Sequence, residues 1–92
     1  MDIFNKMIVK IIQEQEGIIG PIALEQARKV PGLILNWDKH EVELKGNEKE
    51  IVDQLVEQYK HLFGQASVEV CREATRDLMR TVPQNQRPAL LS

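Results

Sequence analysis

The chain has 92 residues, of which 42% are hydrophobic and 28% charged, and its formal net charge is −2. This length suits one small domain, and the apolar share is too high for a wholly disordered chain. Twelve basic against fourteen acidic residues give no positive field for nucleic acid, and no apolar run reaches the roughly 18 residues of a membrane span.

The first 30 residues predict two helices. Apolar residues recur at helical spacing from residue 3 to about residue 16, and Asp2 can cap their start. We expect Gly17 to stop this helix. Gly20 and Pro21 then predict a second helix that runs to Lys29, because proline suits the first turn of a helix.

Residues 33–45 predict a short β-hairpin. The stretches LILNW and EVELK alternate apolar and polar residues on either side of a polar turn. Five apolar side chains would share one face: Leu33, Leu35, Trp37, Val42 and Leu44. Since a lone hairpin is marginal in water, we expect this face to lie against the helices.

The second half of the chain predicts two more helices and a tail. Asn47, followed by Glu50 three residues later, is typical of a helix start, and the apolar spacing continues to Phe63. Gly64 should end this helix, and a fourth helix should run from about residue 65 to residue 80. Residues 83–92 contain two prolines and little to bury, so we expect a flexible tail.

The two halves match when one is shifted by 44 positions. Gly20 then falls on Gly64, and the apolar positions of the first helix fall on those of the third. Any two amphipathic helical hairpins align at some offset, but the matched glycines favour a repeat. We therefore predict one α+β, mainly helical domain over residues 1–82, with two helix–glycine–helix hairpins related by a pseudo-two-fold and bridged by the β-hairpin.

A Glu-x-x-Arg pair occurs in both predicted repeats, as Glu25 with Arg28 and as Glu69 with Arg72. Residues three apart face the same way on a helix, so we favour an exposed contact within each helix. The alternative is a crossed arrangement about the two-fold, in which each glutamate meets the arginine of the other repeat.

The residue types that carry catalysis are present, but their spacing in the sequence does not match that of a known catalytic or metal-binding motif. Cys71 falls on a predicted packed helix, and His40 and His61 are 21 positions apart with no third ligand at a suitable spacing. No glycine-rich phosphate loop occurs. We expect no catalytic, metal or cofactor site. The single cysteine, which cannot form an internal disulfide, fits a cytoplasmic location.

The stretch GIIGPIALEQARKV, at residues 17–30, resembles a segment of helical accessory modules in bacterial signalling proteins such as kinases and response regulators. In that segment an apolar pair, a glycine and a proline precede a helix of small residues. The resemblance implies a non-catalytic bacterial interaction domain.

We expect a non-enzymatic interaction or regulatory module that forms a homodimer, because the first helix carries isoleucine on more than one face. The candidate interaction residues are Ile3, Val9, Trp37, His40, Glu25, Arg28, Glu69 and Arg72. The alternative is a small-ligand sensor with an apolar pocket between the helices and the hairpin, entered beside Trp37.

Overall fold

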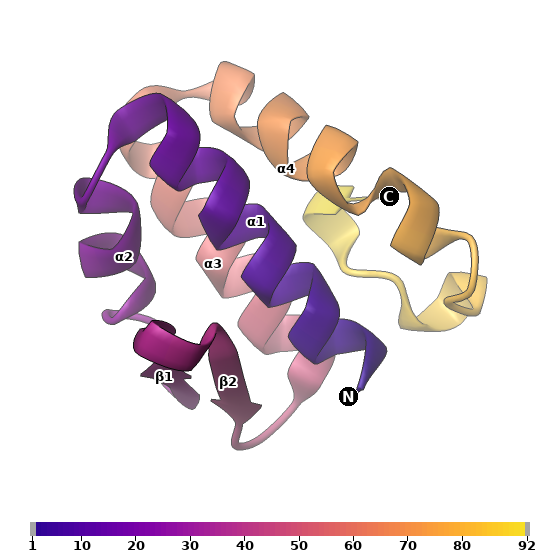
Figure 1. The fold of residues 1–92 in the computed structure, drawn as a ribbon. Helices are drawn as coiled ribbons and strands as arrows, with labels where there is room; N and C mark the ends of the chain where they lie inside the picture. Colours follow the sequence, from indigo (N-terminus) through magenta and orange to yellow (C-terminus); the bar gives the residue numbers. More distant parts are fainter. Residues whose placement is uncertain (1, 92) are drawn as a thin grey trace.

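The computed structural model describes residues 2–91, which form four α-helices and a two-stranded antiparallel sheet. This confirms the predicted α+β, mainly helical class. The elements follow in the order α1, α2, β1, β2, α3, α4, with short 3-10 turns in the hairpin and the tail (Figure 1).

The central element is α1, which spans Ile3–Ile19. It starts at Asp2, whose carboxylate accepts a hydrogen bond from the Phe4 backbone N–H at 3.0 Å. In Figure 1, α1 crosses the middle of the molecule with α3 behind it, and it packs against α2, α3, α4 and β2. Its apolar side chains therefore meet neighbours of the same chain on several sides.

Gly17 does not stop α1, contrary to the prediction. The helix ends two residues later, where Gly20 adopts a φ of 72° and its N–H donates to the Glu16 carbonyl at 3.0 Å. A glycine inside a helix costs only about 1 kcal/mol relative to alanine, which the packing of the flanking turns outweighs. The left-handed conformation needed at the joint is the feature that selects glycine.

The second helix, α2, spans Ile22–Ala27 and is shorter than predicted. Beyond it, the N–H groups of Lys29 and Val30 donate to carbonyls three residues back, each at 3.1 Å, so the chain tightens into turns. These turns bury the Val30 side chain and lead the chain back toward the sheet.

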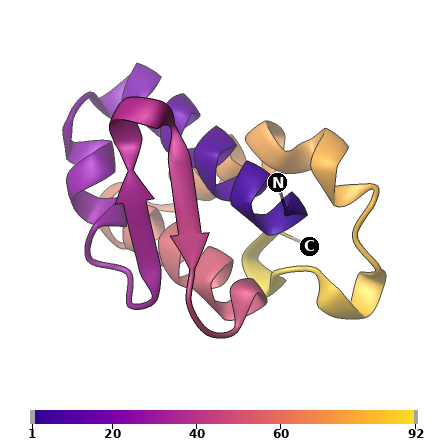
Figure 2. The same cartoon turned by 60° about the horizontal axis from the view of Figure 1, so that its bottom comes forward.

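The strands β1 (Leu33–Asn36) and β2 (Glu41–Leu44) form the predicted hairpin. Leu33 pairs with Leu44 and Leu35 with Val42, so four of the five predicted side chains share one face. The fifth, Trp37, lies outside the strand, because the 3-10 turn Trp37–Lys39 begins there. Figure 2 shows the hairpin in front of the helices, and the Asn5 side-chain amide donates to the Val42 carbonyl at 2.9 Å.

The helices α3 (Glu48–Phe63) and α4 (Gln65–Met79) agree with the prediction to within one residue at each end. The Asn47 side chain accepts a hydrogen bond from the Glu50 N–H at 3.1 Å, which is the predicted cap. Gly64 joins the helices with a φ of 76°, and its N–H donates to the Lys60 carbonyl at 2.7 Å. The chain then returns along α1 and α3 (Figure 1).

The segment after α4 packs on the helices and forms the 3-10 turns Gln84–Gln86 and Ala89–Leu91. Pro88 and Leu91 are buried, and the Asp53 carboxylate accepts the N–H groups of Ala89 at 3.0 Å and Leu90 at 2.9 Å. The expectation that this tail has little to bury is wrong, because an irregular segment has no periodicity that would reveal its inner face. Residues 1 and 92 of the predicted ranges lie outside the described residues.

No helix formed by residues 2–91 combines the length and the apolar character needed to cross a membrane.

Candidate functional site

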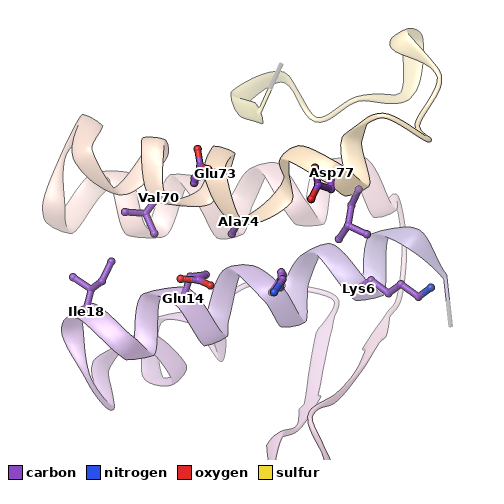
Figure 3. A pocket seen from close by; sticks show the side chains of 9 residues that line it. Lys6, Glu14, Ile18, Val70, Glu73, Ala74 and Asp77 are labelled. Carbon is purple, nitrogen blue, oxygen red and sulfur yellow. The ribbon is translucent and has the colours of Figure 1, made fainter.

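The candidate site is a groove of about 700 Å³ between α1 and α4. The two helices run antiparallel along it, with Ile18 beside Val70 at one end and Lys6 beside Asp77 at the other (Figure 3). Nine side chains line the groove: Lys6, Lys10, Glu14, Ile18, Val70, Glu73, Ala74, Asp77 and Leu78.

The floor of the groove on the α4 side is apolar. Val70, Ala74 and Leu78 follow one another at intervals of four residues and so lie on one face of the helix. Ala74 projects only a methyl group, so the α4 side chains leave space in the middle of the groove. Beside this row, Ile18 of α1 is 63% exposed, the largest value among the exposed large hydrophobic side chains of the described residues.

The α4 wall of the groove is acidic, and the α1 wall carries both signs of charge. Lys6, Lys10 and Glu14 stand on α1, and Glu73 and Asp77 stand on α4. Glu73 forms an ion pair with Arg76, and Asp77 forms one with Arg80 at 3.8 Å, both within α4 and both exposed. Among residues 2–91, neither lysine forms an ion pair, so both ammonium groups remain available to a partner.

The isoleucine argument for a dimer is wrong in its premise. Ile8, Ile11 and Ile12 are completely buried by neighbours of the same chain, and Ile3 and Val9 are half-buried against the same core. The sequence argument assumed one neighbouring helix, whereas α1 has three helices and a strand around it. An apolar surplus on α1 therefore remains only at Ile18, which the sequence analysis did not select.

Trp37 and His40 lie at the hairpin end, away from the groove. The Trp37 indole N–H donates to the Glu16 carboxylate at 3.0 Å, and the half-buried ring packs edge-on against the His40 ring with centroids 4.8 Å apart. His40 itself is exposed and has a φ of 51°. Trp37 thus fastens the hairpin to the last turns of α1.

The Glu-x-x-Arg pairs are exposed. Glu25 lies on α2 and Arg28 directly follows it, whereas Glu69 and Arg72 both lie on α4. Arg72 lies 3.4 Å from Glu69 on its own helix, which is the arrangement that the sequence analysis favoured over the crossed one. An exposed pair of this kind contributes about 0.2–0.5 kcal/mol. Glu69 and Arg72 therefore lie on a solvated face of α4, beside a shallow pocket that they help to line.

Buried polar side chains join the two helical hairpins. The Gln15 amide donates to the Ser67 carbonyl at 3.2 Å, and the Tyr59 hydroxyl donates to the Ala23 carbonyl at 2.7 Å. Within the described residues, no buried side-chain nitrogen or oxygen lacks a hydrogen-bond partner. This seam is satisfied internally and leaves no polar group aimed at a ligand.

Burial makes the thiol and the phenol of this seam inert. Burial raises the pKa of Cys71 to about 11, against the smaller opposing effect of its contact with the Gln15 amide. Burial likewise raises the pKa of Tyr59. Both groups are therefore protonated near neutral pH, and Cys71 has the properties of the small core residue that the sequence predicts.

One pair of carboxyl groups is perturbed at the starts of two helices. A hydrogen bond to Asp2 raises the pKa of Glu48 to about 6, and the same bond lowers the pKa of Asp2. Below about pH 6 the protonated Glu48 carboxyl donates to the ionised Asp2 carboxylate. Asp2 is exposed and Glu48 is half-buried, and the pair links the first turn of α3 to the cap of α1.

Across residues 2–91, no group of three or more histidine, cysteine, aspartate or glutamate side chains is placed to hold a metal ion. Comparison of the chain with protein-family models, with curated proteins and with solved structures gives no match.

The sequence analysis missed the groove residues, although part of the signal was present. Lys6 and Lys10 are four residues apart, as are Glu73 and Asp77, so each pair occupies one helix face. What places the two faces opposite each other is the antiparallel packing of α1 against α4, and these helices are far apart in the sequence.

Proposed function

We propose that the chain is a non-enzymatic protein-interaction or regulatory module that associates with a second copy of itself. The observation that carries the proposal is the exposed Ile18 side chain at the edge of the groove between α1 and α4. Removing a large apolar side chain from water contributes about 1.5–3 kcal/mol when burial is complete. A partner that covers Ile18 recovers part of this free energy.

The distribution of reactive and apolar groups supports an interaction role. Cys71 and Tyr59 are enclosed in the seam between the hairpins, whereas Leu62 and Phe63 are exposed just before the Gly64 joint. Apolar side chains on the surface favour contacts with another protein, and enclosed nucleophiles do not meet a substrate. The resemblance of residues 17–30 to accessory modules suggests bacterial signalling as the setting.

The proposal includes the finer fold prediction, that α1 with α2 and α3 with α4 are two copies related by a pseudo-two-fold. Gln15 and Tyr59 are 44 positions apart, and so are the carbonyls that they reach in the opposite hairpin, Ala23 and Ser67. The joints at Gly20 and Gly64 also share their backbone conformation. An experimental structure in which residues 3–27 do not superimpose on residues 47–71 would remove this part.

The oligomeric state in solution tests the proposal. Sedimentation velocity from low to high micromolar concentration should show a dimer, and Ile18→Asp should weaken it by about tenfold or more. Ile34→Asp is the matched control, because Ile34 is also an exposed isoleucine but lies on the outer face of β1. A chain that stays monomeric, with Trp37 emission quenched by a metabolite, would replace this proposal with the small-ligand sensor.

A further inference from the structure

We infer that the described part of the tail, residues 83–91, occupies a peptide-binding site on α3 and α4 that also accepts a short segment of another protein. The segment that fits this site carries a proline and, three residues later, a leucine, as the chain does at Pro88 and Leu91. The tail is then an internal ligand of its own domain. This inference goes beyond the proposed self-association and does not depend on it.

The polar contacts of the tail show one part of what the site recognises. The Asp53 carboxylate of α3 accepts two successive backbone N–H groups, from Ala89 at 3.0 Å and from Leu90 at 2.9 Å. Hydrogen bonds accepted by a carboxylate are about twice as strong as those between neutral groups. Because backbone donors do not depend on the side chain, Asp53 recognises the turn of the bound segment and not its sequence.

Two apolar side chains add the sequence preference. Pro88 and Leu91 are buried, whereas Ala89 is exposed and Leu90 is half-buried. Proline has no N–H group, so its burial leaves no donor without a partner. The Leu91 N–H donates to the Pro88 carbonyl at 3.0 Å, and the turn that this bond closes packs against α3 and α4. The site therefore selects the first and last residues of the turn and tolerates others between them.

Hollows flank the tail. Figures 1 and 2 show that the tail leaves the end of α4, runs outward and returns to α3. Arg87 and Leu91 line a cavity of about 490 Å³ with residues of α4, and Asn85 and Gln86 line one of about 470 Å³ with residues at the start of α3. The tail thus opens locally at a lower free energy than the helices unfold, and opening uncovers the site.

The covalent connection of the tail sets the strength that a competing segment needs. A segment joined to its site by a short flexible connection acts at an effective concentration on the order of millimolar. A partner segment with the same contacts therefore binds the wild type weakly, and binds more tightly when the docking of the chain's own tail is weakened. The tail keeps the site closed to weak ligands.

A labelled synthetic peptide of residues 83–91 tests the site by fluorescence anisotropy. Leu91→Ser in the chain should weaken the docking of its own tail, because full burial of a leucine contributes about 1.5–3 kcal/mol. The peptide should therefore bind this variant about tenfold or more tightly than it binds the wild type. A peptide that itself carries Leu91→Ser is the matched control, and equal binding of the two peptides would overturn the sequence preference.

Asp53→Asn places the peptide on the proposed surface. Added to Leu91→Ser in the chain, it should weaken binding of the peptide by about fivefold, because an amide oxygen is a weaker acceptor than a carboxylate. Glu57→Gln in the same background is the control, since Glu57 is exposed one turn along α3. Ile18→Asp should leave peptide binding unchanged, so a failure of the proposed self-association is distinguishable from a failure of this site.

The wild type supplies a test that does not require a variant to fold. Hydrogen exchange at the amides of Ala89 and Leu90 should accelerate as the peptide is added, because the peptide takes their acceptor. No binding by a Leu91→Ser chain that melts cooperatively overturns the site. If that variant does not melt cooperatively, unchanged exchange in the wild type at millimolar peptide overturns it. A dimer that survives Ile18→Asp and is lost with Leu91→Ser overturns the assignment to another protein and makes the second copy's tail the occupant.

Discussion

At the scale of single residues, two glycines of this chain differ in whether the structure tolerates a side chain in their place. Gly17 lies inside α1, with open space where a Cβ would project. Gly32 lies in the turn between α2 and the sheet and has a backbone φ of 83°. A Cβ built on Gly32 would lie 2.4 Å from the Lys45 carbonyl oxygen and 3.1 Å from the Ile51 side chain. The first glycine is therefore replaceable and the second is required.

Alanine substitutions measure this difference. Gly17→Ala should raise the free energy of unfolding by about 0.5–1 kcal/mol, because alanine loses less backbone entropy in a helix. Gly32→Ala should lower it by about 2–4 kcal/mol through the left-handed backbone and the clash with Lys45. Urea denaturation of both variants gives the two values, and equal effects of the same sign would contradict the account.

At the scale of elements, Asp2 and Glu48 couple the starts of α1 and α3. Because the folded-state pKa of Glu48, about 6, exceeds its ordinary value of 4.5, the folded chain holds this proton more tightly than the unfolded chain. This stabilising contribution is complete below pH 4.5 and is lost as the pH rises through 6. Asp2, with its lowered pKa, acts in the opposite sense at lower pH.

We therefore expect the free energy of unfolding to decrease as the pH rises from 4.5 to about 6. Glu48→Gln should flatten this slope, because its amide can donate to Asp2 at every pH. Glu50→Gln is the matched control from the same helical turn. Urea midpoints across this range supply the test, together with an NMR titration of the Glu48 carboxyl, and a Glu48 pKa near 4.5 would contradict the coupling.

At the scale of the whole molecule, the tail closes the domain on one side. Asp53 of α3 accepts the N–H groups of Ala89 and Leu90, and the tail residues Pro88 and Leu91 are buried. The chain thus uses a side chain of its second half to hold its own C-terminal turns over α3 and α4. The flexible tail predicted from composition has enough apolar surface to dock.

Asp53→Asn tests the docking of the tail. An amide offers one acceptor oxygen where the carboxylate offers two, so one of the two backbone bonds is lost or weakened, and we expect about 1 kcal/mol of destabilisation. Hydrogen exchange at the Leu90 amide should accelerate, while Glu57→Gln, one turn along α3, should leave it unchanged. Rapid amide exchange of residues 84–91 in the wild type would contradict the docking and support the prediction of a flexible tail.

The sequence alone determined the four helices, the hairpin and most of their boundaries. Helical periodicity, the caps at Asp2 and Asn47 and the helix end at Gly64 are properties of short stretches, and local chemistry suffices to find them. The end of the first helix was placed at Gly17, three residues before the glycine that ends it. The same reasoning placed Leu33, Leu35, Val42 and Leu44 on one face of the hairpin, because strands alternate.

Only the tertiary structure decided which faces remain uncovered. Periodicity identifies the apolar side of a helix but not the number of elements that pack against it. The isoleucines of α1 were therefore predicted to lie in a dimer interface, whereas neighbours of the same chain bury them. It also gave no means of bringing Lys6 opposite Asp77 or the tail onto Asp53. These contacts join residues far apart along the chain, and their existence depends on the packing of all four helices together.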